Sequence, residues 1–423
     1  MNDPGYEDSL EYLYGLEKFG SVFGLDNISR LLGSIDDPHR SFRSIHIAGT
    51  NGKGSVATMI SCMLKEAGYC VGKYTSPHLV SFTERITVNE EEITEEDVAL
   101  LTACIRERAA RDCPDGFHTF FDFTTAIAFE YFRRKKVDIA VIETGLGGRL
   151  DSTNVVEPVI SIVTNVAFDH MKELGGTIKR IAGEKAGIIK KGVPVITGAR
   201  RTALEVIKKT AADNGSAVYA LGRDFSFRKS GHGLMSYRGL QGTIKNVAVN
   251  LNGDHQLSNA AIALCAADVL AGLGYDVAED RIRSALSSVT WQGRLEMIRE
   301  KPLIIFDGAH NASGAQALGH FIRTHYRDRR KVMIFGVMRD KEYRKMLKSL
   351  NDCIDIAILT RPGTERALDA AMMKSMARNP IVTTDTRSAL ARARQIAGDR
   401  DLILVTGSFY TLGEARQAVN EVF

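Results

Sequence analysis

Short apolar runs recur along the chain and alternate with longer segments of helical periodicity. The first run is 44–48 (SIHIA), followed later by 137–142 (VDIAVI) and 159–164 (VISIVT). Uninterrupted apolar runs are typical of parallel strands that are covered on both faces. Helices are expected in the region 6–35 and over 53–67, 95–108, 122–134 and 177–189. This alternation predicts an α/β fold with a mostly parallel sheet.

A second alternating series fills the last third of the chain. It follows a predicted helix at 257–273, and two hairpin-like insertions, at 85–93 and 225–251, interrupt the first series. Each series could close its own doubly wound sheet. We expect a larger N-terminal domain at 1–295 and a smaller Rossmann-like domain at 296–423. In the smaller domain the expected strands are 303–306, 332–335, 354–359, 381–383 and 402–405, and the expected helices are 312–325, 343–350, 367–377, 387–397 and 414–422.

Composition excludes several classes of function. The 55 Lys plus Arg and 51 Asp plus Glu leave a net charge of +4 on 423 residues, too little for the basic face of a nucleic-acid binder. No stretch approaches the ~18 apolar residues of a membrane span, and the N-terminal sequence lacks the features of a signal peptide. The six cysteines form no CxxC pair and indicate a reducing compartment. We therefore expect a cytoplasmic monomer that binds neither nucleic acid nor membrane.

The segment 46–55 (HIAGTNGKGS) has the context of a phosphate-binding loop, because it follows a predicted strand and opens a predicted helix. Glycines let backbone N–H groups turn toward phosphate oxygens, and the helix N-terminus adds favourable partial charge. Lys53 would reach the terminal phosphates, and Ser55 would contact phosphate or Mg²⁺. The spacing departs from a strict Walker A motif because Gly54 separates the lysine from the hydroxyl. The alternative is a glycine-rich turn with a surface lysine.

A second glycine cluster lies at 141–154 (VIETGLGGRLDSTN). Glu143 ends a predicted central strand, where open α/β sheets place their ligands, and a carboxylate near a phosphate loop is an expected partner of Mg²⁺. The segment lacks the third glycine of a dinucleotide-binding fingerprint. Further along, His170 follows the next strand and Lys185 lies in a predicted helix. Taken alone, these three residues would be a solvated glutamate, a structural histidine and a surface lysine.

Eight ordered segments give the chain a family resemblance. It resembles the folylpolyglutamate synthase/dihydrofolate synthase family, which belongs to the Mur-type ATP-dependent amide ligases. The resemblance covers nearly the whole chain and includes a weaker ninth segment at 406–413 (TGSFYTLG). The eight segments are GTNGKGS (49–55), YTSPHL (74–79), ETGLGGRLDSTN (143–154), FDH (168–170), GEKAGI (183–188), NGDHQLSNA (252–260), GRLE (293–296) and DGAHN (307–311).

The resemblance implies a site in which ATP lies between a P-loop N-terminal domain and the Rossmann-like domain. Lys53, His170 and Lys185 are then the catalytic candidates. The implied ATP-binding residues are Asn51, Gly52, Lys53, Gly54, Ser55, Asn259, Arg294, Asp307 and His310. The implied ligands of Mg²⁺, of which two ions are expected, are Ser76, Glu143, His170 and a carboxylated Lys185.

The resemblance also implies a pterin-binding region. Its candidates are Phe121, Asp122, Phe123, Thr124, Leu150, Asp151, Ser152 and Ser408. For Phe121 and Phe123 the alternative is plain core packing. The segment 23–32 (FGLDNISRLL) and Arg149 favour a bifunctional member of the family.

The implied reaction is the ATP-dependent ligation of L-glutamate to dihydropteroate, to reduced folates, or to both, through an acyl phosphate. One alternative is a Mur-type ligase that acts on another carboxylate, such as a UDP-muropeptide. Three features argue against a Mur-type ligase of this kind: the short segment before the phosphate loop, the TSPHL sequence and the LGGRLDSTN sequence. A second alternative is a P-loop regulatory NTPase. The chain lacks an NKxD base-reading motif, which the MRDK at 338–341 does not supply.

Overall fold

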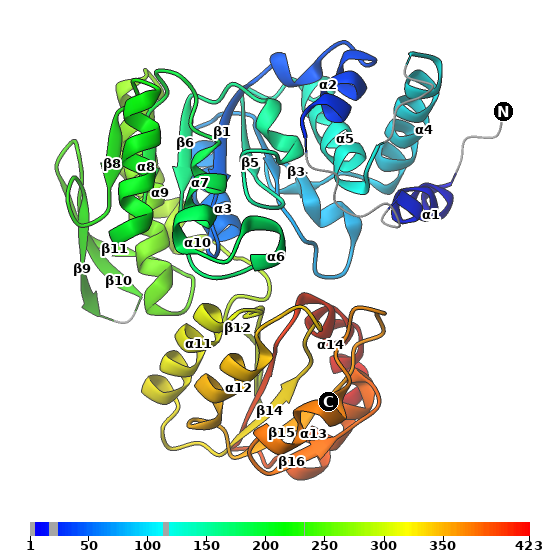
Figure 1. Cartoon of the computed structure of the whole chain (residues 1–423). Coiled ribbons are helices and arrows are strands. Elements are labelled where there is room, and N and C mark those ends of the chain that lie inside the picture. The colour runs from blue at the N-terminus through cyan, green and yellow to red at the C-terminus, as the bar shows by residue number, and fades with distance from the viewer. Residues whose placement is uncertain (1–4, 17–23, 113–117, 232) are drawn as a thin grey trace.

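The computed structural model describes residues 5–16, 24–112, 118–231 and 233–423, which form a larger and a smaller body (Figure 1). The larger body is built on an eight-stranded sheet and carries a separate three-stranded sheet. The smaller body is built on a six-stranded sheet. Both main sheets are mostly parallel and carry helices, so the predicted α/β fold class with a second, smaller sheet is confirmed.

The central strand of the large sheet is β1, which pairs in parallel with β5 and β6. The strand order is β4-β3-β2-β5-β1-β6-β7-β8, in which the β3–β4 hairpin forms an antiparallel edge. This hairpin lies within the predicted insertion at 85–93. The strands are β1 (Arg43–Ala48), β2 (Val71–Tyr74), β3 (Ile86–Val88), β4 (Glu91–Glu92), β5 (Ile139–Glu143), β6 (Ile160–Val163), β7 (Val195–Thr197) and β8 (Val218–Ala220).

Helices cover both faces of this sheet because alternate strand residues point to opposite faces. Ile45 and Ile47 of β1 belong to the cluster under α3 (Lys53–Glu66), α9 (Asp254–Gly272) and α10 (Glu279–Ser288). The antiparallel β9 (Ser226–Gly231), β10 (Leu234–Arg238) and β11 (Thr243–Ala248) extend this cluster and correspond to the predicted insertion at 225–251.

The opposite face is covered by two groups of helices. Ala140 and Ile142 of β5 pack with the first group, and Ala48 packs with the second. The first group is α1 (Tyr6–Gly15), α2 (Asp26–Gly33), α4 (Glu95–Asp112) and α5 (Phe120–Arg134), and the second is α7 (Ile178–Ala186) and α8 (Arg201–Asp213). Short helical turns complete this body: η2 (Pro38–Arg40), η3 (Phe82–Arg85), η4 (Ser152–Val155) and α6 (Met171–Leu174).

The smaller body has the strand order β12-β13-β17-β14-β15-β16, with only β12 antiparallel. One face is covered by α11 (Ala312–His325), α12 (Tyr343–Asn351) and the 3₁₀ segment η5 (Ala370–Met376), and the other by α13 (Thr386–Ile396) and α14 (Phe409–Val422). The strands are β12 (Glu296–Glu300), β13 (Leu303–Asp307), β14 (Lys331–Phe335), β15 (Ile356–Leu359), β16 (Pro380–Val382) and β17 (Leu402–Thr406).

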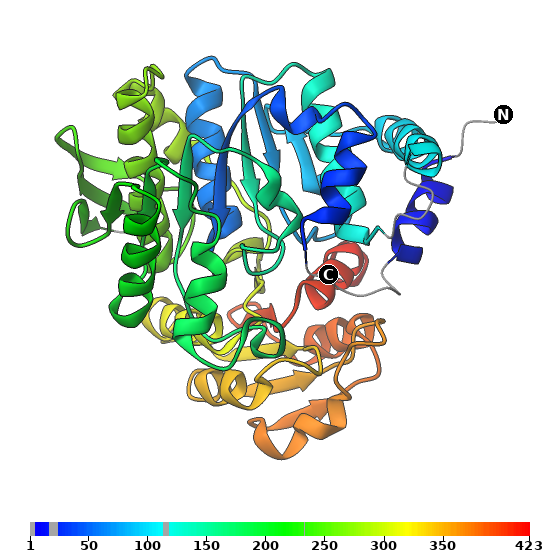
Figure 2. The ribbon, with the colours of Figure 1, turned by 45° about the horizontal axis from the view of Figure 1, so that its top comes forward.

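The C-terminal helix α14, drawn in red, lies on the side of the smaller body that faces the larger one (Figure 2). Its Gly413 lies so close to Leu79 of the larger body that a Cβ atom there would be 2.2 Å from the Leu79 carbonyl oxygen. The covalent connection runs through residues 289–295, between α10 and β12.

One helix prediction is wrong. The segment 367–377 contains the 3₁₀ segment η5 instead of an α-helix. Its buried residues, Ala370 and Met373, are three positions apart, which suits the three-residue turn of a 3₁₀ helix. The C-terminal helix also begins at Phe409, five residues before the predicted start at 414.

No helix in the described part of the chain is long and apolar enough to cross a membrane. The cysteines that the structure describes are free thiols, as the sequence predicts: Cys62, Cys70, Cys104, Cys265 and Cys353. Cys113 lies outside the described residues.

Candidate active site

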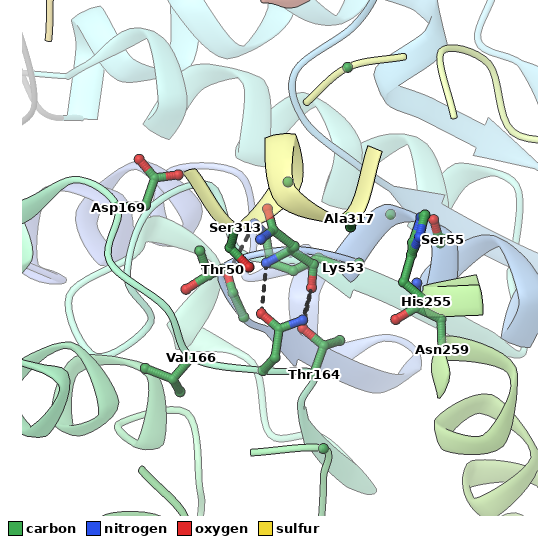
Figure 3. Close-up of a pocket in the computed structure, with 18 of the residues that line it drawn as sticks. Thr50, Lys53, Ser55, Thr164, Val166, Asp169, His255, Asn259, Ser313 and Ala317 are labelled. Atoms are coloured by element: carbon green, nitrogen blue, oxygen red, sulfur yellow. Dashed lines mark hydrogen bonds between the residues drawn. The ribbon is translucent and has the colours of Figure 1, made fainter. Parts of the chain in front are cut away.

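A cavity of about 510 Å³ is lined by both bodies at the carboxyl ends of β1, β5 and β6. Figure 3 shows Lys53 and Ser55 of α3, Thr164 and Asp169 after β6, and Ser313 of α11 around this space. The cavity brings together all the predicted nucleotide and metal residues: Asn51, Gly52, Lys53, Gly54, Ser55, Ser76, Glu143, His170, Lys185, Asn259, Arg294, Asp307 and His310.

The phosphate loop connects β1 to the N-terminus of α3. Gly52 is the N-cap and has a φ of 83°, and a Cβ atom there would lie 2.5 Å from the Asn259 side-chain oxygen. No side chain caps this helix, so the backbone N–H groups of its first turn remain available to an anion. Lys53 Nζ donates to the Gly49 carbonyl oxygen at 3.2 Å and lies 3.5 Å from Glu143 Oε1.

Glu143 ends β5 and is buried. Burial raises the pKa of its carboxyl group, while the charges of Lys53 and Arg294 and a hydrogen bond from the Ser76 backbone oppose the rise. In Arg294, burial lowers the pKa of the guanidinium group, and the charges of Asp307 and Glu143 act in the opposite direction. Burial therefore removes part of the water from around these opposite charges, which strengthens their interaction.

Lys185 is a buried residue of α7, and its Nζ donates to the Gly49 carbonyl oxygen at 3.0 Å. Lys53 donates to the same oxygen, so two lysine side chains meet at one acceptor. Burial, followed by the charge of Lys53, lowers the pKa of Lys185 to about 7. A substantial fraction of this amine is therefore neutral and nucleophilic at neutral pH.

Asp169 connects the two bodies across the cavity. Its Oδ1 accepts a hydrogen bond from Lys341 Nζ at 2.7 Å, and its Oδ2 accepts one from Asn311 Nδ2 at 3.0 Å. His310 Nε2 lies 3.5 Å from the same Oδ2. Burial alone would raise the pKa of the Asp169 carboxyl group, but the hydrogen bond from His310 and the charge of Lys341 hold it well below its usual range.

Two further contacts extend this connection. Asn311 Nδ2 also donates to Asn51 Oδ1 at 2.9 Å, which joins the smaller body to the phosphate loop. Lys341 Nζ lies 3.2 Å from His170 Nε2. Burial and the charge of Lys341 lower the pKa of His170 to about 4, so its imidazole is neutral at neutral pH.

No sequence motif assigns a role to Lys341, Asn311 or Asp169. Lys341 belongs to the MRDK segment, which does not match the NKxD base-reading motif. One available signal was its place shortly after the predicted strand 332–335, because parallel sheets bind ligands at the carboxyl ends of their strands.

Four of the predicted substrate residues lie on or next to α5, behind the wall of the cavity. A Cβ atom on Gly145, which lines the cavity, would be 2.4 Å from the Phe121 ring. Asp122 is buried and accepts hydrogen bonds from Thr119 and Ser152. The other two form part of the core: Phe123 packs edge-to-face on Tyr12, and Thr124 is hydrogen-bonded to Tyr74.

The remaining substrate candidates also form internal contacts. Asp151 accepts hydrogen bonds from the Leu146 N–H and from Thr153, and Ser152 donates to Asp122. Ser408 is buried and caps α14. Leu150 is partly exposed. Two of their neighbours do line the cavity: Leu146, whose N–H group donates to Asp151, and Phe409, which follows Ser408 in the chain.

The donor atoms suit Mg²⁺ in one specific way. Among the described residues, no group of three or more His, Cys, Asp or Glu side chains could hold a metal ion on its own. Mg²⁺ typically binds through one or two carboxylates together with substrate phosphates and water. The cavity offers the Glu143 carboxylate and the Ser76 hydroxyl beside a phosphate loop, so its residues fit an ion that arrives with a nucleotide.

Comparison with known proteins agrees with this geometry. Residues 47–267 match the Mur ligase middle domain, and residues 293–409 match the glutamate ligase domain of Mur ligases. The dihydrofolate synthase/folylpolyglutamate synthase of Bacillus subtilis (strain 168) is 35% identical over 97% of this chain and 98% of its own length. The folylpolyglutamate synthase of Lacticaseibacillus casei is 37% identical over 98% of both chains.

Solved structures extend the similarity to the fold. Escherichia coli FolC in complex with DHPP and ADP matches with a TM-score of 0.91 and 29% identity over 99% of both chains. Mycobacterium tuberculosis folylpolyglutamate synthase, complexed with ADP and AMPPCP, matches with a TM-score of 0.88 and 31% identity over 97% of this chain and 98% of that one. The chain therefore belongs to the dihydrofolate synthase/folylpolyglutamate synthase family of ATP-dependent Mur-type ligases.

Proposed function

We propose that this protein joins L-glutamate to dihydropteroate and to reduced folates, in a reaction that converts ATP to ADP and phosphate. The observation that carries the proposal is one cavity in which the phosphate loop, a buried glutamate, two lysines, Arg294 of the connecting segment and residues of the smaller body meet. The names of the relatives and the ADP and DHPP in a solved neighbour support it.

In this proposal, residues 1–295 form the P-loop domain, residues 296–423 form the Rossmann-like domain, and the protein acts as a monomer. The phosphates of ATP bind at Asn51–Ser55 and the nucleotide extends toward the smaller body. The other proposed nucleotide contacts are Asn259, Arg294, Asp307 and His310, all of which line the cavity.

Mg²⁺ would be held by Ser76, Glu143, His170 and a carboxylated Lys185, and would supply neutralisation of phosphate charge. Carboxylation forms a bond between Lys185 Nζ and the carbon of CO₂, with loss of a proton from the amine. The lowered pKa of Lys185 supports this step because only the neutral amine reacts. Protein equilibrated with ¹³C-bicarbonate should show a carbamate resonance that the Lys185→Met variant lacks; equal spectra would exclude the modification.

The chemistry then has two displacements. An oxygen of the substrate carboxylate attacks the γ-phosphorus and ADP leaves, with Lys53 at the phosphates to offset the charge that develops. The α-amine of glutamate next attacks the carbonyl carbon of the acyl phosphate, and phosphate leaves as the amide forms. Contacts of Asp169 with Lys341 and Asn311 keep the bodies together over the cavity, which limits attack by water on the acyl phosphate.

The pterin would lie near the wall formed by Phe121, Gly145 and Leu146. Asp122, Phe123, Thr124, Leu150, Asp151 and Ser152 would shape this wall, and Ser408 would act from the start of α14. The partner of Arg149 is Glu184, at 2.9 Å. The segment 23–32 and Arg149 favour activity on both dihydropteroate and folates; residue 23 lies outside the described residues.

The direct test is a ligation assay with purified protein, ATP, Mg²⁺ and labelled glutamate. Dihydropteroate and a reduced folate, supplied separately, should each yield an amide product and phosphate, and Lys53→Met should abolish both. Turnover with a UDP-muropeptide but with neither pterin would favour a different Mur-type ligase. ATP hydrolysis that is independent of any carboxylate would favour a regulatory NTPase.

A further inference from the structure

Both bodies hold the C-terminal end of the segment that connects them. On the smaller body, the Leu295 N–H donates to Asp307 Oδ2 at 3.0 Å, and the Gly308 N–H donates to the Gly293 carbonyl oxygen at 2.7 Å. On the larger body, the Asn252 side chain donates to the Leu295 carbonyl oxygen at 3.1 Å. Arg294 therefore enters the cavity from a segment whose backbone both bodies hold.

Trp291, three residues earlier, joins this segment to the phosphate loop. Its indole ring packs on Gly54, where a Cβ atom would lie 3.0 Å from ring atom Cζ2 and 3.1 Å from Nε1. Gly54 follows Lys53 in the first turn of α3 and lines the cavity. The ring therefore rests directly against the helix turn whose N–H groups face the proposed phosphates.

The Trp291 ring, which packs on Gly54, also contacts a buried lysine. Lys73 of β2 is 6% exposed, and its Nζ lies 4.7 Å from the centre of the Trp291 ring. Burial lowers the pKa of Lys73, and the charges of Glu90, Glu92 and Glu143 act in the opposite direction. A partly desolvated ammonium over an indole forms one of the stronger cation–π contacts.

We propose that Trp291 is a positioning residue that couples occupancy of the phosphate loop to the placement of Arg294, and that Lys73 holds its ring in place. This inference rests on the proposed nucleotide site. A phosphate bound at the first turn of α3 acts on Gly54, and Gly54 contacts the indole. The indole is only three residues from the guanidinium group that enters the cavity.

The chain offers a direct readout because Trp291 is its only tryptophan. Tryptophan fluorescence, excited at wavelengths that tyrosine does not absorb, should change when ADP with Mg²⁺ is added. The change should saturate at the dissociation constant that calorimetry gives for the same protein. Calorimetric binding without any change in emission would overturn the proposal, while absence of binding in both measurements would instead refute the nucleotide site.

A double-mutant cycle distinguishes coupling from simple core packing. Gly54→Ala places a methyl group against the ring, so the ring must move by a few tenths of an ångström. This change should weaken ADP binding by roughly fivefold, which corresponds to about 1 kcal/mol, a typical overpacking penalty. In the Trp291→Leu background, where the ring is absent, the same change should have almost no effect. Independent effects that simply multiply would overturn the coupling.

Lys73→Met tests the cation. Loss of a cation–π contact should weaken ADP binding by roughly twofold to thirtyfold and alter the emission of the nucleotide-free protein. The matched control is Lys65→Met. Lys65 lies near the C-terminal end of α3 and forms an ion pair with Glu90. That variant should bind ADP and fluoresce like the wild type. Equal behaviour of the two variants would exclude a specific role for Lys73.

Loss of folded protein is separated from loss of coupling by kinetics. If Trp291 only supports the core, Trp291→Leu lowers the active fraction and therefore kcat, while KM for ATP stays unchanged. Coupling instead predicts a higher KM for ATP and a lower kcat together. Trp291→Phe, which keeps an aromatic ring against Gly54, should restore most of both parameters, and failure of this rescue while the variant stays folded would contradict the proposal.

Discussion

His46 of β1 is fully buried and is joined to the proposed substrate wall by a chain of hydrogen bonds. Its Nε2 lies 2.8 Å from Thr153 Oγ1, and Thr153 donates to Asp151 Oδ1 at 2.5 Å. Since Thr153 uses its hydrogen on the carboxylate, Nε2 of His46 must carry the proton in the other bond. Its buried Nδ1 atom has no hydrogen-bond partner that could accept a second proton, so the imidazole is neutral.

This residue predicts a specific dependence of stability on pH. Burial, followed by the charge of Lys190, lowers the pKa of His46 to about 3. Between its ordinary pKa of about 6.5 and this value, the unfolded chain binds a proton here and the folded chain does not, so stability is lost as the pH falls. When the pH falls from about 7 to about 5, the free energy of unfolding measured with urea should decrease by about 2 kcal/mol more in the wild type than in His46→Gln. If the free energy of unfolding changed with pH in the same way in both proteins, His46 would not be buried in its neutral form.

Single residues also show what the sequence could predict of the site. Lys53 and Glu143 were predictable because their chemistry lies in local motifs at the ends of apolar strands. The contact between Asp169 and Lys341 was not, because the two residues are separated by 172 positions and meet only once two sheets have formed. The ring of Trp291 gave no signal for a similar reason, since Gly54 lies far away in sequence.

At the scale of elements, mostly apolar strands such as β13 and β14 were predictable, whereas several short or polar elements were not. β7 has only three residues, and α10 has buried side chains only at Ile282, Ala285 and Leu286. Such elements form because neighbouring strands and helices cover them, which a local pattern does not reveal. The start of α14 was missed because Phe409 belongs to a glycine-bearing segment that resembles a loop.

The packing of α14 on the larger body leads to a prediction for Gly413. An alanine Cβ atom would be 2.2 Å from the Leu79 carbonyl oxygen, so α14 must withdraw from that segment. Gly413→Ala should lower kcat/KM for ATP roughly fivefold or more, in keeping with overpacking penalties of about 1–3 kcal/mol, with little change in Tm. The control is Gly398→Ala, which meets no atom within 4 Å and should match wild type. Equal activity of both variants would show that α14 does not need this contact.

At the scale of the whole molecule, the contacts of Asp169 join two separately packed bodies. Asp169 and Lys341 each have side chains that are 8% exposed, so removal of one leaves the other charge poorly solvated. Lys341→Met should therefore favour an open arrangement, with a larger radius of gyration in solution scattering and at least a tenfold loss of kcat. Lys345→Met, on the exposed side of α12, should leave both unchanged. An unchanged radius together with full activity would rule out this connection.

The separation of the hydrophobic clusters has a consequence for cooperativity. The clusters of the larger body draw on residues before β12, while those of the smaller body draw on residues from Leu295 onward, with Leu79 as a partly buried addition. The contacts described between the bodies are mainly hydrogen bonds and ion pairs. Such contacts contribute too little free energy to make the two bodies unfold in one cooperative transition. Differential scanning calorimetry should resolve two transitions without nucleotide, and a nucleotide that bridges both bodies should merge them into one at higher temperature. ATP would thus make two independently melting halves behave as a single thermodynamic unit.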